Sequence, residues 1–124
     1  MSENRGIPGI DPSVPPSGVG CVDCLAGNGP GWWFHLRRCA ACGHIGCCDS
    51  SPAQHATRHA RQEGHPFLAS FEPDEDWLWN VETEQYYTGP GLAPPASHPT
   101  TQPVPGPQGH VPEDWQRHLH SSTA

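Results

Sequence analysis

Hydrophobic and polar positions follow a regular pattern only in the middle of the chain, from about residue 21 to residue 87. Short runs that alternate and are rich in aromatic and branched residues predict strands, whereas a longer run without Gly or Pro predicts a helix. The predicted strands are Trp33–Arg38, Pro66–Glu72, Trp77–Val81 and Gln85–Tyr87. We therefore expect an α+β domain, with one main helix packed on a short antiparallel sheet.

The main helix is predicted over Pro52–Glu63 from signals at both of its ends. Ser51 can act as the N-cap, Pro52 suits the first helical position, and Gln54 completes a capping box. Gly64 follows as a residue that readily adopts the left-handed conformation in which many helices end.

Both ends of the chain are rich in Pro and Gly, which interrupt regular structure because Pro lacks an N–H donor and fixes φ. Of the 16 Pro and 14 Gly, eight lie in residues 1–20 and twelve in residues 88–124. We expect a disordered N-terminal tail over 1–20, one domain over 21–87, and a Pro-rich, mostly disordered tail over 88–124. Within the last tail, Val111–His120 could form a short helix with Trp115 and Leu119 on one face.

The central segment is small enough that burial of apolar side chains alone gives little stability, so a metal or disulfide staple is expected. All six Cys lie inside it. The N-terminal residues have no apolar stretch typical of a signal peptide, and no apolar run reaches the roughly 20 residues needed to span a bilayer. We expect a cytoplasmic protein, in which thiols stay reduced and paired cysteines act as metal ligands.

The charge of the chain argues against a nucleic acid as the partner. Thirteen Asp and Glu against six basic residues give a formal net charge of −7. Nucleic-acid-binding proteins draw much of their affinity from Lys and Arg that neutralise phosphates. Because no apolar run is long enough to span a bilayer, we expect no membrane as the partner either.

The cysteines and histidines of the central segment have the spacing of a metal site. Cys21-x2-Cys24 and Cys39-x2-Cys42 are two pairs in which both thiolates can face one ion. Four further candidates follow in the chain, and they are Cys47, His55, His59 and His65. Eight ligands match two closed tetrahedral zinc sites, so we expect two structural Zn²⁺ ions per chain.

Other interpretations of these residues stay open at this point. His44 is an alternative ligand, and Cys48 is a ninth candidate that could be a small buried residue or a free thiol. Disulfide bonds in place of zinc would leave His55, His59 and His65 without a role. A catalytic role for Cys48 as a nucleophile is disfavoured because no histidine partner can be assigned to it, and we expect no enzymatic activity.

The whole pattern resembles the UBP-type zinc finger, a ubiquitin-binding module of deubiquitinating proteases and of a cytoplasmic histone deacetylase. The resemblance rests on the two Cys-x2-Cys pairs, the Gly-His-Ile-Gly-Cys turn that ends at Cys47, the His-Ala-x-x-His helix at His55, the Gly-His-Pro after it and the aromatic strand near Trp77. The segment from Cys47 to Ser51 is similar to freestanding bacterial members in particular.

The resemblance implies a crossed arrangement of ligands. One zinc would be held by Cys21, Cys24, Cys47 and His55. The other would be held by Cys39, Cys42, His59 and His65. Some members bind a third zinc through two cysteines after the helix, but Asn80 and Thr83 stand at those positions here, so no third zinc is expected.

The resemblance also implies a pocket that admits a free Gly-Gly carboxyl end, as in ubiquitin. Trp79 and Tyr86 match two of its aromatic positions, and Arg37 or Arg38 could bind the carboxylate. Asp49 replaces the arginine of ubiquitin-binding members, which puts negative charge near an arriving carboxylate.

The leading hypothesis is a zinc-binding protein-interaction module that recognises a peptide or ubiquitin-like C-terminus. Three alternatives stay open: Trp77 and Trp79 only pack the core, the domain is purely structural and its tails carry the interaction, or the chain is a thiol redox protein.

Overall fold

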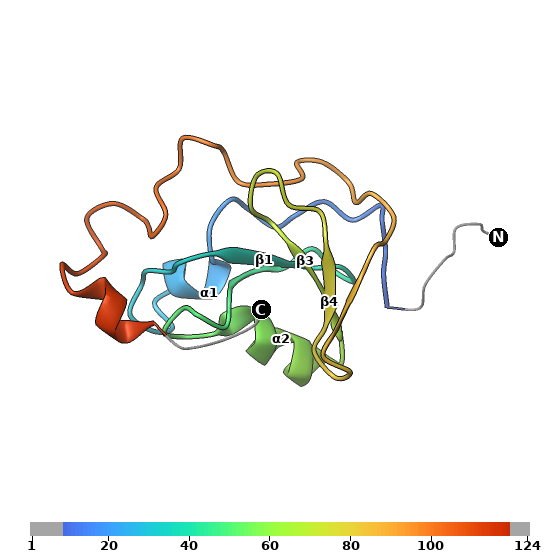
Figure 1. Ribbon diagram of the computed structural model, residues 1–124, viewed down its shortest axis with the longest axis horizontal. Coiled ribbons are helices and arrows are strands. Elements are labelled where there is room, and N and C mark those ends of the chain that lie inside the picture. The colour runs from blue at the N-terminus through green and yellow to red at the C-terminus, as the bar shows by residue number, and fades with distance from the viewer. Residues whose placement is uncertain (1–8, 120–124) are drawn as a thin grey trace.

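The computed structural model describes residues 9–119 (Figure 1). The fold is α+β, as the sequence predicts, with one main helix and a five-stranded antiparallel sheet. In chain order the elements are α1 (Val22–Leu25), β1 (Leu36–Cys39), β2 (Ile45–Cys47), α2 (His55–Glu63), β3 (Phe67–Ser70), β4 (Leu78–Asn80), β5 (Gln85–Tyr87) and the 3₁₀ helix η2 (Trp115–His118).

The sheet has the strand order β2-β1-β3-β4-β5, with every neighbouring pair antiparallel. Helix α2 covers one face of the sheet, and segments from both ends of the chain cross the other face (Figure 1). On the α2 face, Ala56 and Ala60 of the helix pack against Leu68, Trp79 and Val81. The opposite face buries Phe67, Ala69 and Leu78 under Ile10, Tyr87 and Leu92.

Helix α2 begins at His55, three residues later than predicted. Ser51 does not cap it, because its hydroxyl accepts a hydrogen bond from the backbone N–H of Phe34 (2.8 Å). Gln54 takes the N-cap position in a left-handed conformation (φ 55°) that turns the chain into the helix. The predicted end is confirmed, since Gly64 is left-handed (φ 69°) and follows Glu63 directly.

Helix α2 lies unusually close to strand β2, and Gly46 makes this possible. A Cβ on Gly46 would lie 2.7 Å from the backbone nitrogen of Ala56. Any side chain would therefore push the helix away from the sheet. The sequence analysis did not identify β2, in which Gly46 and Cys47 give little strand signal, or α1, which is too short to show a helical period. Strands β3, β4 and β5 lie inside or at the predicted ranges, whereas β1 starts three residues later than predicted and ends one residue beyond the predicted range, at Cys39.

The structure differs from the expectation of disordered tails for residues 9–20 and 88–119. In the N-terminal segment, the N–H of Asp11 donates to the carbonyl of Ala40 and that of Ser17 to Gly43 (both 2.8 Å). The Ser17 hydroxyl in turn accepts the N–H of Ile45 (3.0 Å). The segment thus extends the hydrogen bonding of the β1–β2 turn, which composition alone does not reveal.

Residues 90–99, called the strap below, lie against the face of the sheet opposite α2. Buried Arg38 donates from Nη2 to the carbonyls of Ala93 and Val14 (both 2.7 Å) and from Nη1 to that of Pro95 (3.2 Å). One side chain therefore joins both terminal segments to strand β1.

Beyond the strap, the chain continues along the α1 end of the molecule. Gly106 forms a two-way backbone bridge with Trp33, and Trp115 of η2 stacks on Phe34 with ring centroids 5.8 Å apart. The predicted helix over Val111–His120 is reduced to the four residues of η2, and His120 lies outside the described residues. Within residues 9–119 no helix has the length and apolar character to span a membrane.

Candidate functional site

Four sequence-predicted ligands come together beneath the α1 end of the sheet, and we call them the inner cluster. They are Cys21, Cys24, Cys47 and His55, and all four are buried. Their ligand atoms lie within 4.8 Å of one another. Cys21 directly precedes α1 and Cys24 lies within it, Cys47 ends β2, and His55 begins α2.

The inner cluster has the dimensions of a tetrahedral zinc site. The Sγ atoms of Cys21, Cys24 and Cys47 lie 3.3, 3.4 and 3.5 Å from Nδ1 of His55. Zn–S bonds of about 2.3 Å and Zn–N bonds of about 2.0 Å at the tetrahedral angle place sulfur and nitrogen about 3.5 Å apart. The donor set and its spacing both fit one Zn²⁺, with Nδ1 of His55 as the nitrogen ligand.

The thiols of the inner cluster cannot all ionise without a cation. Hydrogen bonds from Cys24 and Cys47 lower the pKa of Cys21 to about 2. The thiolate of Cys21 in turn raises the pKa of Cys24 to about 12, and that of Cys47 rises for the same reason. Zinc binding would therefore release the protons of Cys24 and Cys47.

The other four predicted ligands form the outer cluster, which lies where the β1–β2 turn meets the C-terminal part of α2 and is more open to solvent. They are Cys39, Cys42, His59 and His65, and their ligand atoms also lie within 4.8 Å of one another. Sγ of Cys39 is 3.5 Å from Nδ1 of His65, and Sγ of Cys42 is 3.2 Å from Nε2 of His59. Cys42 is exposed, and both imidazoles are half-buried. The distances again fit a tetrahedral zinc site.

The two clusters are crossed in the way that the resemblance implies. His55 and His59, one turn apart on α2, belong to different clusters. Each cluster therefore fixes the same helix to a different part of the sheet. Asn80 is no ligand, because its buried side chain accepts the N–H groups of Glu82 and Thr83 (2.8 and 3.1 Å) and shapes the β4–β5 turn.

Cys48 and His44 lie outside both clusters. Cys48 is buried, and its Sγ lies 3.4 Å from the hydroxyl of Ser51. Its surroundings are those of a small core residue, with no imidazole within hydrogen-bond distance among residues 9–119. His44 stacks on the outer-cluster ligand His59.

Three sequence-predicted residues meet Trp77 on the α2 face, and we call this group the arginine–aromatic surface. It consists of Arg37, Trp77, Trp79 and Tyr86. The guanidinium of Arg37 lies 4.6 Å from the centre of the Trp77 ring. The Tyr86 ring contacts Trp77 edge-on (5.2 Å) and Trp79 at a tilt (4.6 Å). Register explains the grouping, because Trp79 pairs with Tyr86 across β4 and β5.

The members of this surface differ in exposure. Trp79 is 7% exposed and packs on Ala56 and Ala60, so its indole belongs largely to the core. Tyr86 is 53% exposed. The sequence analysis considered Trp77 only as a core residue, but its ring contacts Arg37. The two residues come together across β3, which the sequence does not show without the strand order.

Arg37 is the electrostatically unusual member of the surface. It is 7% exposed, and its Nη1 donates to the carbonyl of Leu36 (2.9 Å). Its buried Nε has no hydrogen-bond partner in the described chain. The ion pairs among residues 9–119 do not include it. A buried guanidinium with an unused donor is costly unless an acceptor occupies the site.

Asp49 is held at the start of α2. Its carboxylate accepts a hydrogen bond from the hydroxyl of Thr57, and its backbone carbonyl accepts one from Nε2 of Gln54 (2.9 Å). A carboxylate at a helix N-terminus is stabilised by the helix dipole. The charge that the sequence analysis assigned to this position is therefore fixed in place by local structure.

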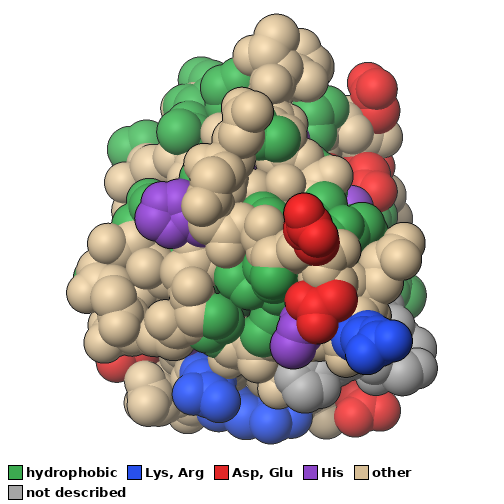
Figure 2. Space-filling model, turned by 90° about the vertical axis from the view of Figure 1, so that its left-hand side faces the viewer, with side chains coloured by type: hydrophobic (Ala, Val, Ile, Leu, Met, Phe, Trp, Pro, Cys, Tyr) green, Lys and Arg blue, Asp and Glu red, His purple; other side chains and the backbone are tan. Residues whose placement is uncertain are grey.

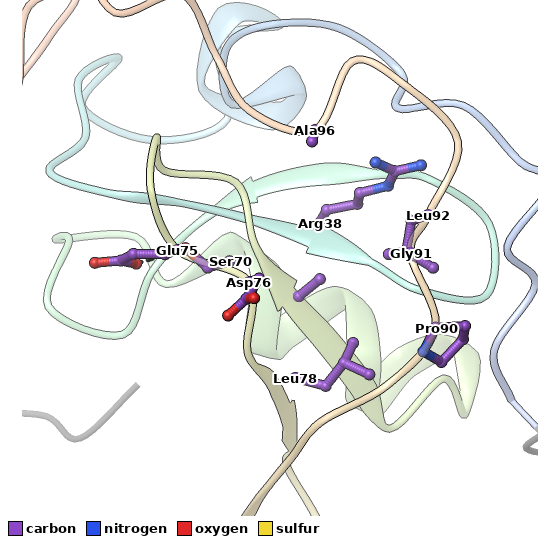
Figure 3. Close-up of a pocket in the computed structure, with 10 residues that line it drawn as sticks. Arg38, Ser70, Glu75, Asp76, Leu78, Pro90, Gly91, Leu92 and Ala96 are labelled. Carbon is purple, nitrogen blue, oxygen red and sulfur yellow. Dashed lines mark hydrogen bonds between the residues drawn. The ribbon is translucent and has the colours of Figure 1, made fainter.

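A separate cavity of about 160 Å³ lies under the strap, on the opposite face of the sheet from α2 (Figure 3). Arg38 extends from β1 toward the strap at Leu92, whereas Glu75 points away from it (Figure 3). Arg38 is the second arginine that the sequence analysis considered for binding a carboxylate. Its guanidinium donates instead to the backbone carbonyls of Val14, Ala93 and Pro95. It is therefore a structural residue here, and Arg37 remains the candidate.

One buried polar cluster was missed by the sequence analysis. Glu72 accepts the N–H of Leu36 at Oε2 (2.8 Å), and its Oε1 lies 2.9 Å from Nε2 of His98 and 3.2 Å from Nδ1 of His35. Burial would raise the pKa of Glu72, but the close contact with His35 and the hydrogen bonds from His98 and Leu36 outweigh it and lower the pKa to about 2. His98, which lies in the tail predicted to be disordered, is 3% exposed and fastens the end of the strap.

Comparison with known proteins, like the geometry of the two clusters, indicates a zinc-binding domain. A family model described as "Zn-finger in ubiquitin-hydrolases and other protein" matches residues 21–92. A solution NMR structure of protein RPA1320 from Rhodopseudomonas palustris is 42% identical to this chain, covers 75% of it and 85% of its own length, and superposes with a TM-score of 0.56. Among curated proteins, none matches the chain at a significant level.

Proposed function

This chain belongs to the family of zinc fingers in ubiquitin hydrolases and other proteins, and from that premise we propose that it is an interaction module that holds two Zn²⁺ ions and binds the free C-terminal carboxylate of a partner protein. The zinc ions have a structural role. Four protein ligands complete each tetrahedron, which leaves no position for a catalytic water. The module is proposed to have no enzymatic activity.

The observation that carries the proposal is the buried guanidinium of Arg37, whose Nε has no hydrogen-bond partner within residues 9–119. A carboxylate can accept two hydrogen bonds from one guanidinium in a planar, bidentate arrangement. The backbone carboxylate at the end of a peptide is such an acceptor, and every protein presents one. Binding it would satisfy Nε of Arg37, which otherwise stays desolvated without a partner.

The aromatic rings beside Arg37 supply the rest of the contact. Trp77 holds the guanidinium by a cation–π contact at 4.6 Å. The half-exposed ring of Tyr86 stands next to Trp77 and offers a wall for the last residues of a peptide. Because Trp79 packs against α2 and presents little of its ring to a ligand, the proposed peptide ends in small residues such as Gly.

Charge narrows the class of partner further. The chain carries −7 overall, and on the end of the molecule seen in Figure 2 acidic, basic and His side chains are interspersed, with no extended basic patch on that face. These features support a protein partner over a nucleic acid or a membrane surface. The acidic balance also fits a cytoplasmic protein whose partners present neutral or basic C-terminal segments.

The test is a titration of the zinc-loaded full chain, followed by Trp fluorescence. A short peptide that ends in Gly-Gly with a free carboxylate is compared with the same peptide ending in an amide. We expect binding of the free acid and at least a tenfold weaker binding of the amide, because a hydrogen bond to a charged group is lost.

Arg37→Gln should abolish the preference for the free acid. Arg61→Gln is the matched control, since Arg61 is an exposed arginine on α2. Equal binding of acid and amide, or an Arg37→Gln variant that keeps the preference, would contradict the proposal. Either result would favour the second candidate, a purely structural domain, which the burial of Trp79 supports.

A further inference from the structure

A polar cavity lies between the inner and outer clusters and is lined by residues from both. Its wall includes His55 of the inner cluster and His59 of the outer cluster. Four further titratable residues line the same cavity and belong to neither cluster, and they are Asp23, His44, Arg58 and Glu63. The proposed binding function does not use them.

His44 makes two well-defined contacts in this cavity. Its Nε2 lies 3.0 Å from Oδ2 of Asp23. Its ring is parallel to that of His59, with an interplanar angle of 1° and centroids 4.0 Å apart. Nδ1 of His44 is buried and has no hydrogen-bond partner in the described chain. With an acceptor facing Nε2 alone, neutral His44 carries its proton on Nε2 and donates it to Asp23.

The positions of these residues in the chain connect the two clusters. Asp23 lies in α1, between the inner-cluster ligands Cys21 and Cys24. His44 follows the outer-cluster ligand Cys42 by two residues. We propose that Asp23 and His44 form a positioning pair that holds the zinc ligand His59 in place and couples metal binding at the outer cluster to metal binding at the inner cluster. The proposal rests on the zinc sites proposed above.

The physical basis is the stacking of an electron-rich ring on an electron-poor one. Nε2 of His59 faces Sγ of Cys42 at 3.2 Å, so this nitrogen would ligate the metal and the imidazole would lose electron density to it. The hydrogen bond to the Asp23 carboxylate makes the His44 ring richer in electrons. Face-to-face contact between two such rings is favourable, and it favours the metal-bound form of His59 over the free form.

The coupling follows from which segment places Asp23. A filled inner cluster fixes both ends of the Cys21–Cys24 turn, and Asp23 with it. Fixed in this way, Asp23 holds His44 against His59 before the outer cluster binds metal. Coupling of this kind is reciprocal, so a filled outer cluster should also stabilise the inner one.

A second route of coupling runs through α2, because His55 and His59 lie on the same helix. A double-mutant cycle separates the two routes. The single variants are Asp23→Ala, which removes the acceptor, and His44→Phe, which keeps a ring on His59 but removes the donor. The third variant combines them. Asp76→Ala is the control for loss of an acidic charge, because Asp76 is exposed and lies outside the cavity.

The measurement is the rate at which the zinc-loaded full chain transfers each ion to a chromophoric chelator. We expect Asp23→Ala and His44→Phe each to speed release from the outer cluster about fivefold, the lower end of typical coupling between sites. The double variant should be no faster than either single one. Asp76→Ala should match the unchanged chain.

Substitution with Co²⁺ gives a readout that general loss of stability would not move. Co²⁺ with two thiolates and two imidazoles has a visible spectrum distinct from that with three thiolates and one imidazole. In the single variants we expect a changed outer-cluster spectrum and an unchanged inner-cluster spectrum. Two ions per chain with additive effects of Asp23→Ala and His44→Phe would overturn the coupling alone. Fewer than two ions in the unchanged chain would reject the two-zinc arrangement itself.

Discussion

The two faces of the sheet are held by different chemistry. On the α2 face, eight Cys and His side chains converge on two points and fix the helix to the strands. On the opposite face, no metal cluster is found within residues 9–119, and two buried side chains fasten the strap, Arg38 by donating hydrogen bonds to it and Glu72 by accepting one from His98. The first face uses a few strong, localised bonds, and the second uses several weaker ones from backbone groups far apart in sequence.

This difference implies different ways of coming apart. Removal of metal would affect every element that the clusters join, because α2, β1, β2 and the Cys21–Cys24 turn each contribute ligands. Loss of a strap contact would free only the strap, because the sheet beneath keeps its own ladder of hydrogen bonds. The α2 face should therefore control global folding and the strap face only local opening.

The largest expected effect is loss of the fold when the inner cluster is disrupted. A structural zinc site in a small domain contributes on the order of 10 kcal/mol to folding, which exceeds the whole stability of most small domains. Chelation of zinc or the variant His55→Ala should therefore unfold residues 21–87 as a unit. Backbone NMR spectra before and after chelation test this. Dispersed signals that survive chelation would show that the hydrogen-bonded face can hold the fold alone.

A smaller and local effect is expected at the strap when Glu72 loses its charge. Its folded-state pKa of about 2 lies below the ordinary value of 4.5. The ionised form is thus favoured in the folded state, and a shift of this size corresponds to about 3 kcal/mol. This contribution is fully present above pH 4.5 and is lost as the pH falls from 4.5 towards 2.

Hydrogen exchange of the His98 amide, which donates to the carbonyl of Phe71 (3.0 Å), reports on this contribution. At pH 7, Glu72→Gln should reduce the protection of this amide by a large factor while the chain keeps its full zinc content. Zinc content is measured in the same samples, so that acid release of metal is seen separately. If protection at α2 falls as much as protection at His98, the two faces do not open independently.

The two faces also differ in how far the sequence predicts them. Cys and His are rare residue types, and a bound ion fixes the spacing of its ligands along the chain. The sequence alone therefore predicts all eight members of the inner and outer clusters. The start of α2 was placed three residues early because Ser51, a good N-cap by type, serves Phe34 instead. The residues around Ser51 in the sequence give no indication of this contact with Phe34, because the two residues lie 17 positions apart.

The strap was missed for a related reason. Its acceptors are the backbone carbonyls of Ala93 and Pro95, which every sequence possesses, and its Pro and Gly content is typical of disorder. Only the folded sheet brings Arg38 within reach of residues more than 50 positions away. The grouping of Arg37 with Trp77 depends on the strand order β1-β3-β4 in the same way.

The smallest expected effect concerns ligand binding, and it asks which face a peptide uses. Asp49 is fixed at the start of α2 by Thr57, and its negative charge opposes an arriving carboxylate. Asp49→Arg should strengthen binding of ubiquitin offered with a free C-terminus by about tenfold, which corresponds to about 1.4 kcal/mol. Arg38→Met, on the strap face, should leave that affinity unchanged although it loosens the strap. Titrations of both variants, followed by Trp fluorescence at two salt concentrations, separate the faces, because a gain that is electrostatic shrinks as salt is added. Low-micromolar binding of ubiquitin by the unchanged chain would show that Asp49 does not hinder the carboxylate. An effect of Arg38→Met on affinity as large as that of Asp49→Arg would place the peptide on the opposite face of the sheet from Arg37.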